Sequence, residues 1–189
     1  MKKPDPLPKT QIKLPPPLHT EVRWSDAARK INIGSLKYVT MEALMRQAAR
    51  ATFFNSPSLH ELPKGDDKST FVIDVNVVDD EEMKEVNHQY RGKNKSTDVL
   101  SFAQLEGEST FGAGEQILLG DIIISLPTAL KQAEEEGHPL KEEMAFLTVH
   151  ATLHLLGYDH ENAADKKHMW EQQNAIMARI CSWPPNRKR

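Results

Sequence analysis

VHATLHLLGYDH, residues 149–160, carries two histidines four positions apart and a third six positions after the second. On a helix, side chains four residues apart share one face with Cβ atoms about 5–6 Å apart, so His150 and His154 can reach one cation. Gly157 tolerates the left-handed conformation that ends a helix. The chain can then fold back, which would return His160 to the same point.

These three histidines predict a metal site. A single helical histidine is more often a core or surface residue than a ligand, but a third histidine after a glycine stop favours metal binding. Neutral nitrogen ligands suit Zn²⁺ better than calcium or magnesium, and they also accept nickel or copper. Three ligands leave one tetrahedral position for water, as in catalytic zinc sites. We expect His150, His154 and His160 to hold one zinc ion, and we leave His168 out.

The residue after the first histidine argues against a zinc protease. Metalloproteases of the H-E-x-x-H type place a glutamate base there, and this chain has Ala151. Glu142 and Glu143 lie about two helical turns earlier, which is too far to replace that base. Ser101 has no histidine and carboxylate in an obvious nucleophile arrangement, so serine hydrolase chemistry is not supported.

Length and composition indicate an ordinary globular protein. The chain has 189 residues and a formal net charge of −3, which fits one domain and shows no overall basicity. Its one cysteine excludes an intramolecular disulfide. No apolar stretch is long enough to cross a bilayer, and the N-terminal lysines precede no hydrophobic signal region. We expect a cytoplasmic protein without a membrane partner.

Three segments are expected along the chain. Residues 1–19 hold six prolines and predict an extended or disordered extension. Residues 20–183 form the single domain that would carry the metal site. Residues 184–189 form a short basic tail.

Within the domain, β-type and helical patterns alternate. The predicted strands are Thr70–Val78, Asp98–Phe102 and Gly120–Leu126. The predicted helices are Thr40–Phe54 with Thr40 as its cap, Glu81–Tyr90 after the capping residues Asp79 and Asp80, a helix from Pro127 to Gly137, Leu140–Leu156, and Asn162–Cys181. This interleaving indicates an α+β fold, an α/β sandwich in which helices cover a small mixed sheet.

A basic, turn-rich loop precedes the second predicted strand. Residues 90–96, YRGKNKS, contain three cations at Arg91, Lys93 and Lys95. An arginine fork can hold a phosphate in two places, and the neighbouring Tyr90 can stack on a base. A solvated connecting loop explains the same residues equally well, so the loop alone leaves RNA binding open.

Three motifs together resemble one known family. YRGKNKSTDVLSF (90–102), LGDIIIS (119–125) and VHATLHLLGYDH (149–160), in this order and spacing, closely resemble the bacterial rRNA-maturation family YbeY, from about Phe71 to Met177. The resemblance implies a metal-dependent endoribonuclease that cleaves single-stranded RNA. It places the family's zinc ligands on His150, His154 and His160, and its functionally important arginine on Arg91.

The same resemblance implies a biological role. It points to maturation of the 3′ end of 16S rRNA, with roles in ribosome assembly and quality control. The implied partners are precursor 16S rRNA and small-subunit or ribosome-assembly proteins, and no DNA is expected.

The chain departs from the family pattern at several positions. Ala151 stands where glycine is usual. A helix favours alanine over glycine by about 1 kcal/mol, so the helix should tolerate this change. Ser96 and Ala103 stand where proline is expected, which could shift the loop edge without removing chemistry. Gln172 and Gln173 stand among positions that are commonly acidic in the last helix, which puts a role for that helix face in doubt.

The residues leave parts of the mechanism open. Arg91 would neutralise charge on the phosphate, and the nucleophile is either water or the adjacent 2′-OH. Asp159 is a candidate acceptor for a ligand N–H, or alternatively a cap for the last helix. Two other functions fit the motif: a ribosome-assembly binding factor with a structural zinc, and a zinc hydrolase of another phosphate or amide substrate.

Overall fold

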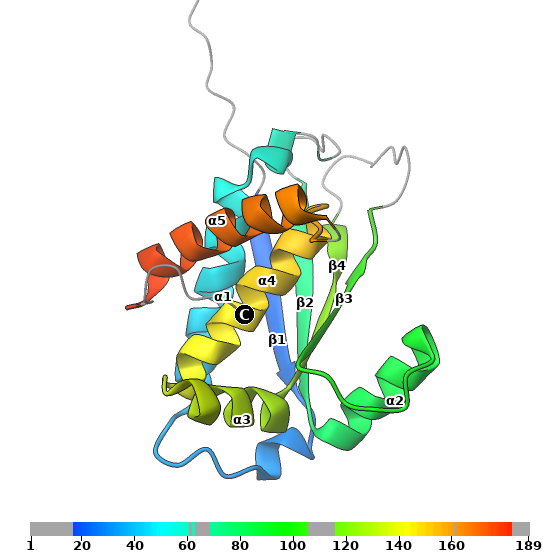
Figure 1. The fold of residues 1–189 in the computed structure, drawn as a ribbon, viewed down its shortest axis with the longest axis vertical. Helices are drawn as coiled ribbons and strands as arrows, with labels where there is room; N and C mark the ends of the chain where they lie inside the picture. The colour runs from blue at the N-terminus through cyan, green and yellow to red at the C-terminus, as the bar shows by residue number, and fades with distance from the viewer. Residues whose placement is uncertain (1–16, 61, 63–68, 106–115, 161, 183–189) are drawn as a thin grey trace, which may run out of the picture.

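The computed structural model describes residues 17–60, 62, 69–105, 116–160 and 162–182 (Figure 1). The strands are β1 (Leu18–Trp24), β2 (Thr70–Val78), β3 (Val99–Ala103) and β4 (Gln116–Ser125). The helices are α1 (Tyr38–Asn55), α2 (Asp80–Arg91), α3 (Leu126–Glu136), α4 (Leu140–Leu155) and α5 (Ala163–Ile180), with short 3-10 turns at Ala28–Lys30 and Pro57–His60.

The four strands form one mixed sheet in the order β1-β2-β4-β3. β1 and β4 run parallel to β2, and β3 runs antiparallel to β4. Burial alternates strictly along β2, where Phe71, Ile73, Val75 and Val77 are buried and the intervening residues are half-buried. One face of the sheet therefore packs on the core, as a period of two residues requires.

Helices α1 and α4 pack on that face, and α5 packs in turn on α1 and α4 (Figure 1). α4 is buried on nearly all sides, because the sheet, α1, α3 and α5 all contact it. Its apolar residues belong to one core with β2 and β4. The stretch with the three histidines thus starts from an enclosed helix. The predicted α+β class is confirmed.

Most predicted elements are confirmed. β2 has the predicted bounds. Asp79 caps α2 by accepting from the backbone N–H of Glu82, whose side chain accepts from the Asp79 N–H, a capping box. Pro127 lies in the first turn of α3, and Gly137 ends that helix in the left-handed conformation at φ 70°.

Other expectations were wrong at the level of single elements. β1 was not predicted, and its first two residues fall within the segment assigned to the N-terminal extension. The cap of α1 is Lys37 rather than Thr40, and α1 begins at Tyr38. β4 begins at Gln116 and ends at Ser125, so Leu126 belongs to α3. β4 carries a register shift opposite Val72 and Ile73, where an extra residue interrupts the alternation that marks a strand in sequence.

The outer parts of the predicted domain division are not described. Most of the extension, residues 1–16, and the whole basic tail, 184–189, lie outside the described residues, so the division stays a prediction. The loop between β3 and β4 lies outside them at 106–115. In the described part of the chain, no helix is both long enough and apolar enough to span a membrane.

Candidate metal centre and its cleft

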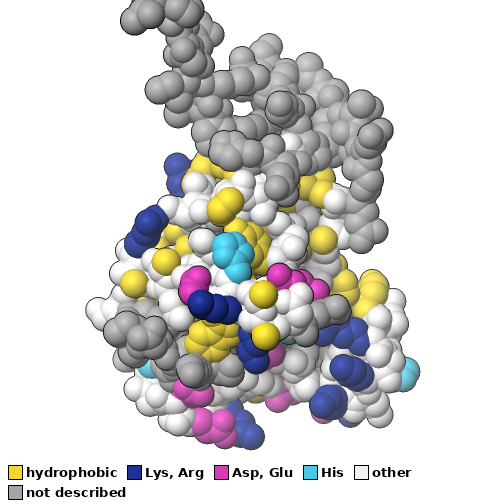
Figure 2. Space-filling view, turned by 45° about the horizontal axis from the view of Figure 1, so that its top comes forward, with side chains coloured by type: hydrophobic (Ala, Val, Ile, Leu, Met, Phe, Trp, Pro, Cys, Tyr) yellow, Lys and Arg dark blue, Asp and Glu magenta, His cyan; other side chains and the backbone are white. Residues whose placement is uncertain are grey.

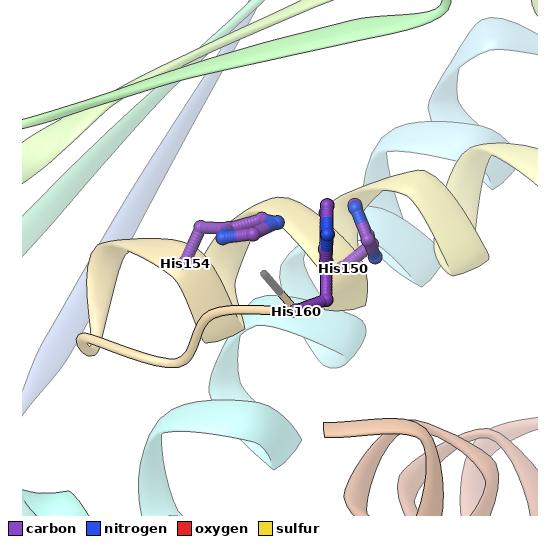
Figure 3. Close-up of side chains that lie close together, drawn as sticks. All are labelled: His150, His154 and His160. Atoms are coloured by element: carbon purple, nitrogen blue, oxygen red, sulfur yellow. The ribbon is translucent and has the colours of Figure 1, made fainter. Parts of the chain in front are cut away.

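The structure brings the three predicted histidines together (Figure 3). One nitrogen of each side chain lies within 4.8 Å of the others. The ring centroid of His154 is 4.8 Å from that of His150 and 5.0 Å from that of His160. His150 and His154 project from one face of α4, and His160 approaches from the segment after the helix (Figure 3).

The helix end places His160. Gly157 has φ 85°, a conformation that side chains with a Cβ rarely adopt. Its N–H donates to the His154 carbonyl at 3.0 Å, and the Tyr158 N–H donates to the Leu153 carbonyl at 3.1 Å. These bonds reverse the chain within a few residues, as the glycine stop predicted.

Hydrogen bonds orient the two helical imidazoles. The Nδ1 of His154 lies 2.9 Å from the Tyr158 carbonyl oxygen, and the Nδ1 of His150 lies 3.0 Å from the Oε1 of Gln173. A carbonyl oxygen only accepts, so each Nδ1 carries the proton and each Nε2 keeps a free lone pair. Metal-binding histidines are commonly fixed in this way.

Burial keeps these rings neutral. It lowers the pKa of His150 to about 4, with a further lowering by the neighbouring His154. Burial also lowers the pKa of His154, followed by the effect of His160. Neutral imidazoles bind metal without first losing a proton, so the donor set fits a borderline divalent cation such as zinc.

Two carboxylates near the histidines, those of Asp159 and Glu143, have other contacts. Asn162, not Asp159, caps α5, so the capping role considered for Asp159 is wrong. The carboxylate of Asp159 accepts the backbone N–H of His160 at 2.6 Å. Glu143 is fully buried with its Oε2 2.9 Å from the Nε2 of His138, which agrees with leaving it out as a general base.

Arg91 reaches the same site from another element. It is the last residue of α2, and Gly92 ends that helix at φ 66°. Its positive charge is among the causes that lower the pKa of His154, and its side chain lines the cleft around the histidines. Lys93 and Lys95 are exposed and are not among the residues that line this cleft.

The loop after Arg91 is anchored by hydrogen bonds. The side-chain amide of Asn87 donates to the Lys95 carbonyl at 2.7 Å. The hydroxyl of Ser96 donates to Asp80 at 2.7 Å, and the same carboxylate oxygen accepts from Ser125 and Thr128. These bonds lower the pKa of Asp80 against the opposing effect of its burial. Arg91 thus lies at a helix end whose following loop is held by hydrogen bonds.

The cleft has a volume of about 590 Å³, a size typical of ligand sites. On the face shown in Figure 2, histidine side chains lie among hydrophobic ones, with cationic and acidic side chains beside them. One wall comes from α5 through Lys166, Met169, Trp170 and Gln173. Sequence reasoning gave these residues no role, although the helical spacing of Lys166, Trp170 and Gln173 places them on one face.

His168 lies apart from the three candidate metal ligands. Its ring stacks on Tyr158 with centroids 5.6 Å apart, and it is not in the group that could hold a metal. Leaving it out of the predicted ligand set agrees with this position.

Known proteins resemble this chain over most of its length. The family model described as Endoribonuclease YbeY matches residues 38–181. A protein named endoribonuclease YbeY from Caldanaerobacter subterraneus is 42% identical over 147 residues, which cover 74% of this chain and 87% of the relative. One of the same name from Thermoanaerobacter is 47% identical over 116 residues, covering 57% and 73%.

A solved structure supports the fold. The solution structure of TM1509 from Thermotoga maritima matches with a TM-score of 0.51 and 23% identity, over 86% of this chain and 89% of that one.

Proposed function

Since this chain belongs to the YbeY endoribonuclease family, we propose that it cleaves single-stranded RNA with a metal ion held by His150, His154 and His160. The observation that carries the proposal is the convergence of three histidine nitrogens in a cleft that also receives Arg91. The cofactor we propose is one zinc ion, because three neutral imidazoles suit it.

Zinc bound there would supply Lewis acidity toward a phosphoryl oxygen and would activate a water molecule or hydroxyl group. The chain contributes orientation and charge. Gln173 and the Tyr158 carbonyl hold the imidazoles with Nε2 toward the cleft. Arg91 provides a fixed fork of donors that stabilises the negative charge developing on the phosphate.

The proposed substrate is the precursor of 16S rRNA, cleaved during maturation of its 3′ end in the cytoplasm. Roles in ribosome assembly and quality control, with ribosomal or assembly proteins as partners, belong to the same proposal. Its support is the similarity of the three motifs to the family, together with a cleft that can receive a phosphate.

One assay tests the proposed activity. Single-stranded RNA is incubated with the wild type, the metal-stripped protein with and without added zinc, and His154→Ala. We expect cleavage by the wild type, loss on stripping, recovery with zinc, and none by the variant. Equal cleavage in every arm would indicate a contaminating nuclease and overturn the proposal. Metal removal that lowers the melting temperature, with no turnover at any stage, would support the binding factor with a structural zinc instead.

A further inference from the structure

One face of α5 forms a wall of the cleft. Lys166, Trp170 and Gln173 follow one another at helical spacing, and all three line the cleft beside the histidines. Gln173 fixes the position of this face relative to α4, because its Oε1 lies 3.0 Å from the Nδ1 of His150. Trp170 is three residues away, so its Cβ lies about 5–6 Å from that of Gln173. The indole therefore lines the same cleft as the three histidines.

Trp170 is not needed to fill the core. The buried residues of α5 are Met169, Gln173, Ile176 and Met177. Trp170 is only half-buried and is not among the residues of the core cluster or those packed against it. Within the described part of the chain, no hydrogen bond satisfies its indole N–H. A large aromatic side chain in this position has a surface available to a ligand.

Two cations, Lys166 and Arg91, line the same cleft as Trp170, and two carboxylates, Asp98 and Asp159, line it as well. Lys166 is exposed, one turn before Trp170, and no carboxylate of the described residues lies within ion-pair distance of it. The next residue, Lys167, instead pairs with Glu171 at 3.8 Å. Arg91 lines the cleft from α2. An aromatic ring and cations in one groove are the combination that binds single-stranded nucleic acid, because bases stack on the ring and phosphates pair with the cations.

We propose that Trp170 is a stacking platform for the unpaired nucleobase next to the scissile phosphate, and that Lys166 contacts an adjacent backbone phosphate. This inference rests on the proposed function and deepens it. Every base has a π face, so the platform tolerates any sequence. A base inside a duplex is already stacked and paired, so Trp170 would favour single strands over duplexes.

Steady-state cleavage of a single-stranded RNA oligonucleotide by the zinc-loaded protein tests the role. Trp170→Ala is expected to raise KM by roughly ten-fold with kcat within about two-fold of the wild type. Trp170→Phe keeps an aromatic face and is expected to stay within about three-fold in KM. Lys166→Ala is expected to raise KM and reduce its salt dependence, whereas the matched control Lys167→Ala leaves both unchanged.

An abasic nucleotide at each position near the cleavage site identifies the stacked base. At one position it should raise KM for the wild type and leave KM of Trp170→Ala unchanged. Tryptophan fluorescence gives a second readout, because RNA should quench the wild type more than Trp170→Phe. Melting temperatures establish that each variant is folded.

The outcomes separate the two proposals. Suppose the wild type cleaves RNA, Trp170→Ala has the same KM, and no abasic position raises the KM of the wild type. This result would overturn the platform and leave the proposed function intact. No cleavage by the wild type, with quenching and affinity that still depend on Trp170, would overturn the proposed function and support the platform. If RNA quenches the fluorescence of the wild type, Trp170→Phe and Trp170→Ala equally and binds all three with equal affinity, the platform is overturned whatever the cleavage activity.

Discussion

The Oε1 of Gln173 lies 3.0 Å from the Nδ1 of His150 and so links α5 to α4, the helix that carries His150 and His154. This hydrogen bond directs the Nε2 of His150 toward the cleft and holds the ring in one orientation. Both groups are neutral, which makes the contact a positional restraint rather than an ion pair.

Gln173→Ala should weaken zinc binding by about 10–100-fold, because outer-shell partners of histidine ligands commonly contribute that much. Competition with a chromogenic chelator measures the affinity. Gln172→Ala is the matched control, since Gln172 does not line the cleft, and its zinc affinity should equal that of the wild type. Unchanged affinity for Gln173→Ala would remove the orienting role of this side chain.

His154→Ala should lose both zinc and RNA cleavage, because two remaining ligands hold a divalent metal poorly. Elemental analysis of protein purified without a histidine tag gives the metal content and distinguishes zinc from nickel or copper. His88→Ala serves as the control, since His88 is exposed on α2 away from the cleft. A His154→Ala protein with full metal content would contradict the ligand assignment.

Arg91→Ala should retain zinc, and its kcat for cleavage should fall by about 10²–10³-fold. The removal of one hydrogen-bond donor to a developing oxyanion has an effect of this size. Arg91→Lys should recover only part of the loss, because a lysine cannot form the two-pronged contact. Lys93→Ala, two residues further on and outside the cleft lining, should cleave like the wild type. Equal turnover by Arg91→Ala and wild type would refute the phosphate role.

Gly120→Ala should lower the free energy of unfolding by about 2–5 kcal/mol, from backbone strain and overpacking. The added Cβ would lie 2.8 Å from the Cδ2 of Leu155 and even closer to the Phe102 carbonyl, at a φ of 151°. Gly34→Ala gives the backbone cost at an ordinary left-handed position without a steric clash, since its φ is 64° and nothing lies within 4 Å. Urea unfolding should show a larger loss for Gly120→Ala; equal losses would exclude the steric contribution.

The metal-free protein should lose stability as the pH falls from about 6.5 to about 4. Burial lowers the folded-state pKa of His150 to about 4, whereas an unfolded histidine titrates near 6.5. Between these pH values the unfolded chain binds one more proton than the folded chain, so acid favours unfolding. The free energy of unfolding should fall by roughly 3 kcal/mol from pH 6.5 to pH 4. Urea unfolding across this range should show the loss, and His150→Gln should flatten it. If the free energy of unfolding of His150→Gln falls with pH as steeply as that of the wild type, the loss does not come from His150.

Local patterns predicted much of the fold. Strict alternation and β-branched residues predicted β2, and capping chemistry predicted the start of α2 and the end of α3. β1 was missed although its residues, LHTEVRW, alternate in polarity, because they directly follow a proline-rich segment that was assigned to the extension. Its pairing with β2 makes it a strand, and pairing is a long-range property.

The candidate metal-binding group could be predicted from residues close together in the chain. A helix repeats every 3.6 residues, which puts His150 and His154 on one face, and Gly157 permits the reversal that returns His160. The arrival of Arg91 depended on family resemblance, because its loop alone had an equally good explanation as solvated surface.

The α5 wall of the cleft came only from the tertiary structure. Gln173 is 23 residues from His150, and no local rule relates the crossing of α5 over α4 to the identity of either residue. Packing of Met169, Ile176 and Met177 into the shared core determines that crossing and turns Lys166, Trp170 and Gln173 toward the cleft with the three histidines. Short-range periodicity thus set the ligands, while long-range burial of apolar surface decided which side chains surround them.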